Sequence, residues 1–301
     1  MTVDQTHTPQ IKAMINAHFG TTITPFEVDT NYQQSLLEHQ KDCFHRIKDQ
    51  AFMGGLTVLI GEPGTGKSIF KQALFELNQK QWHIIAINRS IFSWNSFLCL
   101  LCQALDIEDN NAKSVTLEKS ILKVVRKLNS RGKCLIFMVD DAHLIPQELL
   151  KRIRLLLEDF PKNHNLVLIG HLELMSMLRR RDHEDILSRI TNSAEFKPLS
   201  PSQTKEFIYS QLDKVQLPHS TFTFEAIDLI CKISSGNLRS IKNLCVSSMV
   251  EAVRMQVHHI DHPQVNSVLN QPHWRKSSQL EGIEPVVFTN QQPNYKGKEL
   301  N

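Results

Sequence analysis

The sequence has no long apolar segment. Its longest apolar candidates, Leu56–Ile60 and Cys134–Val139, have the length of strands, whereas a helix that spans a bilayer needs about 20 residues. The N-terminus also lacks the basic and then apolar stretches of a secretory signal peptide. These absences disfavour the membrane and secreted classes of protein, and we expect a cytoplasmic chain that makes no membrane contact.

Net charge is also small. The 34 Lys and Arg residues against 31 Asp and Glu give +3 over 301 residues. This net charge is too small to point to any class of partner. Any contact with nucleic acid must therefore come from local groups of cations. The length predicts about two domains, and an apolar content of 41% is ordinary for a globular chain that buries a sizeable core.

Metal-binding patterns are weak. Among six cysteines only Cys99 and Cys102 are close, as a formal C-x-x-C, which is read either as a redox or zinc pair or as two small apolar residues of a helix. The helix interpretation is favoured, because no second Cys or His pair stands at zinc-finger spacing. His258, His259 and His262 lack a surrounding set of ligands and are interpreted as structural or solvated. The small number of cysteines is consistent with a protein of the reducing cytosol.

Strand-like and helical segments alternate over the first two thirds of the chain. This alternation predicts the α/β class, with a parallel sheet covered by helices on both faces. After Pro198 the strand signal stops and the periodic segments are all helical. The predicted strands are 56–60, 83–87, 134–139 and 166–169.

One motif carries the clearest chemistry. Gly61-Glu62-Pro63-Gly64-Thr65-Gly66-Lys67-Ser68 is a full G-x-x-x-x-G-K-S between a predicted strand and a predicted helix. Its glycines let successive backbone N–H groups and a helix N-terminus face phosphates. We expect Lys67 to bind the β- and γ-phosphates of ATP, and the hydroxyl of Ser68 to bind Mg²⁺.

Two carboxylates supply the second half of such a site. Asp140 and Asp141 directly follow the apolar strand 134–139. We expect Asp140 to complete the Mg²⁺ shell and Asp141 to orient or deprotonate the attacking water. Position 141 is more often Glu in such ATPases, and Asp is one methylene shorter, so slow hydrolysis is one expected outcome.

These motifs together resemble the AAA+ ATPases. The resemblance implies a P-loop domain with a three-layer parallel sheet, followed by a C-terminal helical lid. It further implies that His171, after the fourth strand, senses the γ-phosphate, and that Arg239 acts as the second sensor at a helix start. Arg189 would be the arginine finger that reaches the ATP of a neighbouring subunit, with 179–181 as competitors for that role.

A narrower resemblance is to the ExeA-like branch, over about residues 14–275. It is carried by His18-Phe19-Gly20, by Pro25-Phe26 and by the segments 140–143 and 236–239. The branch includes general-secretion ATPases and transposon-encoded ATP-binding proteins of the TniB, TnsC and IstB type. Residues 19–26 would then cover the adenine, or else form a hydrophobic staple before a helix.

Two hypotheses follow for what the ATP cycle drives. In the first, the protein is an oligomeric regulator of DNA transposition, a ring or filament that selects duplex target DNA and recruits a transposase, with a target-selection protein as a further partner. In the second, it is a secretion or pilus-assembly ATPase. Secretion members of the branch usually continue into a membrane anchor and a wall-binding domain, so the end of this chain after its helical segments favours transposition.

DNA contact would need cations aligned on one face. Two sets fit this requirement by their spacing, and each phosphate neutralised would add salt-sensitive, sequence-independent affinity. The alternative for each set is a solvated face of an amphipathic helix. The candidates are Lys119, Lys123, Arg126 and Lys127 in the first set, and Lys151 and Arg152 in the second.

These observations divide the chain into four parts. An N-terminal segment, 1–50, is expected to contact the nucleotide or an adjacent subunit. The P-loop ATPase domain covers 51–198 and the helical lid 199–272. The last part, 273–301, is polar and is expected to be a flexible tail, either inert or able to dock a partner.

Overall fold

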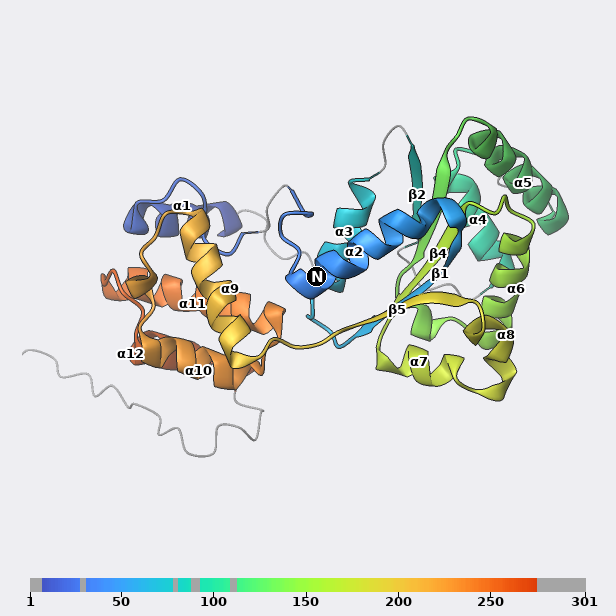
Figure 1. Ribbon diagram of the computed structural model, residues 1–301. Coiled ribbons are helices and arrows are strands. Elements are labelled where there is room, and N and C mark those ends of the chain that lie inside the picture. Colours follow the sequence, from blue (N-terminus) through green and yellow to red (C-terminus); the bar gives the residue numbers. More distant parts are fainter. Residues whose placement is uncertain (1–6, 28–30, 78–80, 88–92, 109–112, 275–301) are drawn as a thin grey trace, which may run out of the picture. The chain divides into compact units, whose positions relative to one another are not determined.

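The computed structural model describes residues 7–27, 31–77, 81–87, 93–108 and 113–274 (Figure 1). The chain forms two compact units. A sheet unit contains residues 28–199 and 237–239, and a helical unit contains residues 1–27, 200–236 and 240–301. Almost all of the predicted tail, from residue 275, lies outside the described residues.

The sheet unit is built on five parallel strands in the order β2-β3-β4-β1-β5. This confirms the predicted α/β class and parallel sheet. Four of the strands were predicted, and β5 is an addition whose polar, alternating sequence gives little apolar signal. The strands are β1 (Gly55–Gly61), β2 (Trp82–Ile87), β3 (Cys134–Val139), β4 (His164–Gly170) and β5 (Ile190–Phe196).

Helices cover both faces of this sheet and make three layers (Figure 1). Side chains of a strand alternate between faces, so Leu59 packs under α2 and α3, whereas Val58 and Ile60 pack under the other helices. The helices of the first face are α2 (Glu38–Gln50) and α3 (Lys67–Phe75). Those of the second are α4 (Trp94–Ala104), α5 (Ser114–Ser130), α6 (Gln147–Glu158), α7 (Leu172–Leu178) and α8 (Glu184–Leu187).

Strand register decides which loops meet. β1 and β3 pair with opposite sides of β4, with Ile60 opposite Gly170 and Val139 opposite Leu168. Since all strands are parallel, the loops after β1, β3 and β4 leave from the same edge of the sheet. This edge carries the G-x-x-x-x-G-K-S loop, the two aspartates and His171.

The helical unit combines α1 with the helices after Leu199. Ser200 caps α9, and its hydroxyl accepts a hydrogen bond from Gln203 N, with Pro201 at the first helical position. Thr223 caps α10 in the same way. The helices are α1 (His7–Phe19), α9 (Pro201–Lys214), α10 (Phe224–Ser234), α11 (Leu238–Met255) and α12 (His262–Leu269).

The two ends of the predicted N-terminal segment, 1–50, fall in different units. Within the helical unit, His18 stacks on His258 with ring centroids 4.4 Å apart, and the buried ring of Phe26 packs edge-on against Phe222. α2, by contrast, packs on the sheet. The adenine cover by residues 19–26 stays a prediction.

Among the described residues, no helix combines the length and the apolar character that crossing a membrane requires. All six cysteines are free thiols, and Cys102 is buried in the core with Cys99 packed against it on α4. The C-x-x-C spacing is therefore accounted for by packing.

Candidate active site

The loop between β1 and α3 has the backbone that its glycines permit. Gly64 and Gly66 have φ angles of +83° and +96°, in the region that favours glycine. Gly66 is also the N-cap residue of α3, so the first N–H groups of that helix are free of helical partners. Such a loop at a helix N-terminus favours an anion, above all a phosphate.

The loop is fixed from its inner side. Thr65 is 1% exposed, and its hydroxyl donates to Glu62 O at 2.8 Å. Gln40 of α2 donates from Nε2 to Thr65 O at 3.1 Å. Gly61 has no space for a side chain, since a Cβ there would lie 2.7 Å from Phe196 O of β5. These contacts hold the loop in place from within the sheet unit.

Lys67 lies at the start of α3 and folds back on the loop. Its Nζ donates to Gly61 O at 2.6 Å and to Glu62 O at 2.8 Å. Burial lowers the pKa of Lys67, while Asp140 and Asp141 raise it in opposition. The two predicted carboxylates therefore act electrostatically on the predicted phosphate-binding lysine. Ser68, the next residue of α3, is exposed.

Asp140, directly after β3, forms an ion pair that the sequence did not suggest. Its Oδ2 lies 2.5 Å from Nζ of Lys71, and its Oδ1 accepts from Asp141 N at 3.0 Å. Lys71 is four residues after Lys67 on α3, hence on the same face of the helix. That spacing is the signal that could have indicated Lys71.

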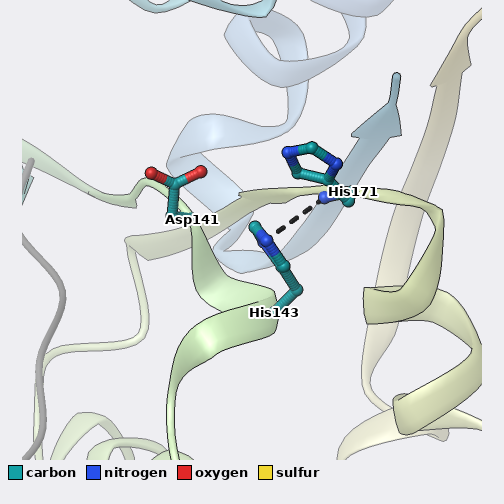
Figure 2. Close-up of side chains that lie close together, drawn as sticks. All are labelled: Asp141, His143 and His171. Atoms are coloured by element: carbon teal, nitrogen blue, oxygen red, sulfur yellow. Dashed lines mark hydrogen bonds between the residues drawn. The ribbon is translucent and has the colours of Figure 1, made fainter. Parts of the chain in front are cut away.

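Asp141 begins the short 3-10 turn Ala142–Leu144 and has a φ of +51°, uncommon for a residue other than glycine. Its side chain is exposed. Nearby, the rings of His143 and His171 lie 4.4 Å apart, and His171 N donates to His143 Nδ1 at 3.5 Å (Figure 2). Burial lowers the pKa of His143, and the neighbouring His171 lowers it further.

The two candidate arginines occupy different places. Arg189 directly precedes β5 and so lies at the amino edge of the parallel sheet, opposite to the loop. Its guanidinium pairs with Glu158 at 2.7 Å and is 55% exposed. Arg239 belongs to the sheet unit through the segment 237–239, and its charge is among those that lower the pKa of Lys67. The competing arginines, 179–181, are exposed after α7.

The predicted DNA-binding cations differ in their surroundings. Lys151 pairs with Glu148 at 3.5 Å, and the guanidinium of Arg152 lies 4.4 Å from the ring centre of Trp94. These two are engaged inside the sheet unit. The other four are exposed on α5 and form no ion pair with any part of the chain that the structure describes. They are Lys119, Lys123, Arg126 and Lys127.

Known proteins share this architecture. Residues 50–178 match the family described as "AAA domain". The chain is 26% identical over 260 residues to general secretion pathway protein A of Aeromonas hydrophila, a match that covers 84% of this chain. It covers 47% of that protein, so the chain spans about half the length of this relative.

Solved structures give the same fold. The Drosophila ORC bound to DNA aligns with a TM-score of 0.60 at 15% identity, over 89% of this chain and 67% of that one. Cdc6p from Pyrobaculum aerophilum aligns with a TM-score of 0.60 at 17% identity, over 84% and 70%. At these identities the likeness concerns the fold alone.

Proposed function

We propose that this protein, which its AAA domain and its relatives identify as an ATPase, hydrolyses ATP at the edge of the sheet where β1, β3 and β4 end. Lys67 binds the phosphates, Ser68 and Asp140 hold Mg²⁺, and Asp141 activates the attacking water. The observation that carries this assignment is the pairing of β1 and β3 on opposite sides of β4. This pairing brings the phosphate loop and both carboxylates to one edge.

The residues present suit Mg²⁺ and a nucleotide. The hydroxyl of Ser68 and the carboxylate of Asp140 are the oxygen ligands that Mg²⁺ prefers, and the glycines of the loop permit the backbone that turns N–H groups toward a phosphate at the N-terminus of α3. When bound, Mg²⁺ neutralises charge on the phosphates. Lys71 holds Asp140 by an ion pair in the protein alone and would share or release that carboxylate when Mg²⁺ binds.

Three further residues are assigned to sensing and assembly. His171 lies after β4 at the same edge and is assigned to the γ-phosphate, and Arg239 to coupling between the nucleotide and the helical unit. Arg189 stands at the opposite edge of the sheet, a place that supports action on the ATP of another copy. This assignment requires a homo-oligomer, either a ring or a filament, in which one edge faces the other.

We infer that the ATPase works in a general secretion pathway. The similarity to the Aeromonas hydrophila protein supports this second hypothesis, because it extends over 260 residues and thus well beyond the AAA domain match at 50–178. No comparison gives similar support to a role in transposition. The secretion hypothesis therefore replaces the transposition hypothesis as the preferred one.

A genetic experiment tests this role. The gene is deleted in the organism that carries it, and the culture supernatant is assayed for exported proteins. We expect export to fall and to be restored by the wild-type chain but not by Lys67→Ala. Lys41→Ala is the matched control, because Lys41 is a partly exposed lysine that pairs with Glu38 on α2. Unchanged export after deletion would contradict the role.

One observation keeps transposition as a second candidate. The four cations of α5 face solvent without ion pairs in the described residues, which favours a phosphate backbone as their partner. In that case the assembly would bind duplex DNA and recruit a transposase, with a target-selection protein as a further partner. Binding to duplex DNA with and without an ATP analogue separates the candidates. The quadruple variant K119Q/K123Q/R126Q/K127Q should bind weakly, and K151Q/R152Q normally.

A further inference from the structure

A cluster of two imidazoles and one carboxylate lies at the edge of the sheet beside the proposed Mg²⁺ site. It consists of Asp141, His143 and His171, each with a ligand atom within 4.8 Å of those of the other two. Within the described residues, no other group of three His, Cys, Asp or Glu side chains meets this condition. Figure 2 shows the three side chains at the ends of two neighbouring strands.

The fold itself brings the cluster together. His143 follows β3 by four residues and His171 directly follows β4, and the parallel pairing of these strands sets them side by side. Gly170 assists, because a Cβ there would lie 2.9 Å from Leu174 and 3.4 Å from His143 N. Its missing side chain leaves room for Leu174 of α7, while the turn that carries His143 lies at ordinary contact distance.

The ligand types select a class of metal. Imidazole nitrogen binds Zn²⁺, Co²⁺, Ni²⁺ and Cu²⁺, whereas Mg²⁺ prefers an all-oxygen shell. Zn²⁺ takes two His and one carboxylate in many sites and keeps a fourth position for water. Bonds of about 2.0–2.1 Å require ligand atoms closer than 4.8 Å, and the exposed side chain of Asp141 can rotate to close that gap.

We propose that Asp141, His143 and His171 bind one transition-metal ion of the Zn²⁺ class, distinct from the Mg²⁺ of ATP, and that this ion stops hydrolysis. A carboxylate that is bound to the metal is a weaker base toward the attacking water, because the cation offsets its negative charge. Lys67 and Ser68 are outside the cluster, so ATP binding continues, whereas His171, as a ligand of the metal, no longer contacts the γ-phosphate. The inhibition rests on the proposed role of Asp141, whereas the metal site itself does not.

Metal binding is tested first, without ATP. Co²⁺ is titrated into the full chain and its visible d–d absorption is recorded, with Zn²⁺ used afterwards to displace it. We expect one equivalent of Co²⁺ whose affinity falls by about tenfold or more in His143→Ala, because the variant lacks one of the three ligands. His258→Ala is the control, because His258 also stacks on a histidine at 4.4 Å but belongs to no group of three ligands among the described residues. Equal binding by His143→Ala would overturn the site.

Inhibition is tested second, at a fixed excess of Mg²⁺. Wild-type hydrolysis should fall as Zn²⁺ rises while the affinity for a fluorescent ATP analogue stays within a fewfold, because Lys67 and Ser68 still bind the nucleotide when the metal holds His171. His143→Ala should keep its basal rate and need about tenfold more Zn²⁺ for the same loss. Binding of Co²⁺ with no effect of Zn²⁺ on hydrolysis would overturn the inhibitory role. Absence of any ATPase activity with normal Co²⁺ binding would instead count against the proposed function.

Discussion

Lys71 of α3 and Asp140 at the end of β3 form an ion pair, with Nζ 2.5 Å from Oδ2 and both side chains largely buried. The charge of the carboxylate proposed to hold Mg²⁺ is thus offset by a lysine of the same chain. A pair of this kind both positions Asp140 and opposes the charge that would otherwise be unpaired near the core.

Removal of this lysine gives the first prediction. Lys71→Met keeps the length of the side chain but leaves Asp140 unpaired, and we expect the free energy of unfolding to fall by about 1–3 kcal/mol. Mg²⁺ and ATP should restore more stability in the variant than in the wild type, because the metal replaces the lost cation. Urea denaturation with and without Mg·ATP measures both effects. Lys71→Arg is the control, and equal stability of Lys71→Met and wild type would contradict the role of the pair.

The second prediction concerns the backbone of the phosphate loop. Gly66 has a φ of +96°, and a Cβ there would lie 2.5 Å from Nε2 of Gln40. We expect Gly66→Ala to lose about 1–2 kcal/mol from left-handed strain, and also to bind ATP poorly because Gln40 must move. Gly132→Ala is matched, since Gly132 has a φ of +75° but open space around its Cβ. It should lose stability alone, and a loss of ATP binding there would contradict this explanation.

The third prediction tests action between subunits. Arg189→Ala should bind ATP but hydrolyse it about 1,000-fold more slowly, the usual size of an arginine-finger effect. Its stability should change little, because the pair with Glu158 is half-exposed. A mixture of Arg189→Ala with Lys67→Ala should regain activity, since mixed interfaces join an intact phosphate loop to an intact arginine. No recovery on mixing would place Arg189 outside the neighbouring site, and Arg179→Ala serves as control.

The fourth prediction concerns a buried thiol. Burial raises the pKa of Cys134 to about 11, so at pH 8 about one thiol in a thousand is the reactive thiolate. Labelling by iodoacetamide should be slow at Cys134 and should rise about tenfold per pH unit up to that pKa, as long as the fold persists. Peptide mass spectrometry measures each site, with the half-buried Cys99 as internal comparison. Rapid labelling of Cys134 at pH 7 would contradict its place in the sheet.

Local patterns were sufficient to predict the fold class and the ATPase activity, and both are confirmed. The phosphate loop is a contiguous motif whose chemistry depends on residues 61–68 alone. The parallel sheet follows from buried apolar strands that alternate with helices. The position of Asp140 beside the phosphate loop could also be predicted, because a carboxylate at the end of a buried parallel strand lies at the same edge of the sheet as the loop.

Features that depend on strand order or on an edge strand could not be read in this way. In β5, Thr191, Ser193 and Glu195 face solvent, so its pattern lacks the apolar run of a buried strand. His143 and His171 lie close together only because β3 and β4 are neighbours in the sheet. No local sequence pattern predicts that pairing. The choice between transposition and secretion also lay outside the motifs, since both hypotheses use the same ATP site.

The most direct test of the central claim is single-turnover hydrolysis of Mg·ATP by Asp141→Asn. Asn tolerates a positive φ about as well as Asp, so the turn after β3 should keep its backbone while the base is lost. We predict ATP binding within a fewfold of the wild type and hydrolysis slower by about 100-fold or more. Hydrolysis at the wild-type rate would contradict the assignment of Asp141 and with it the proposed site.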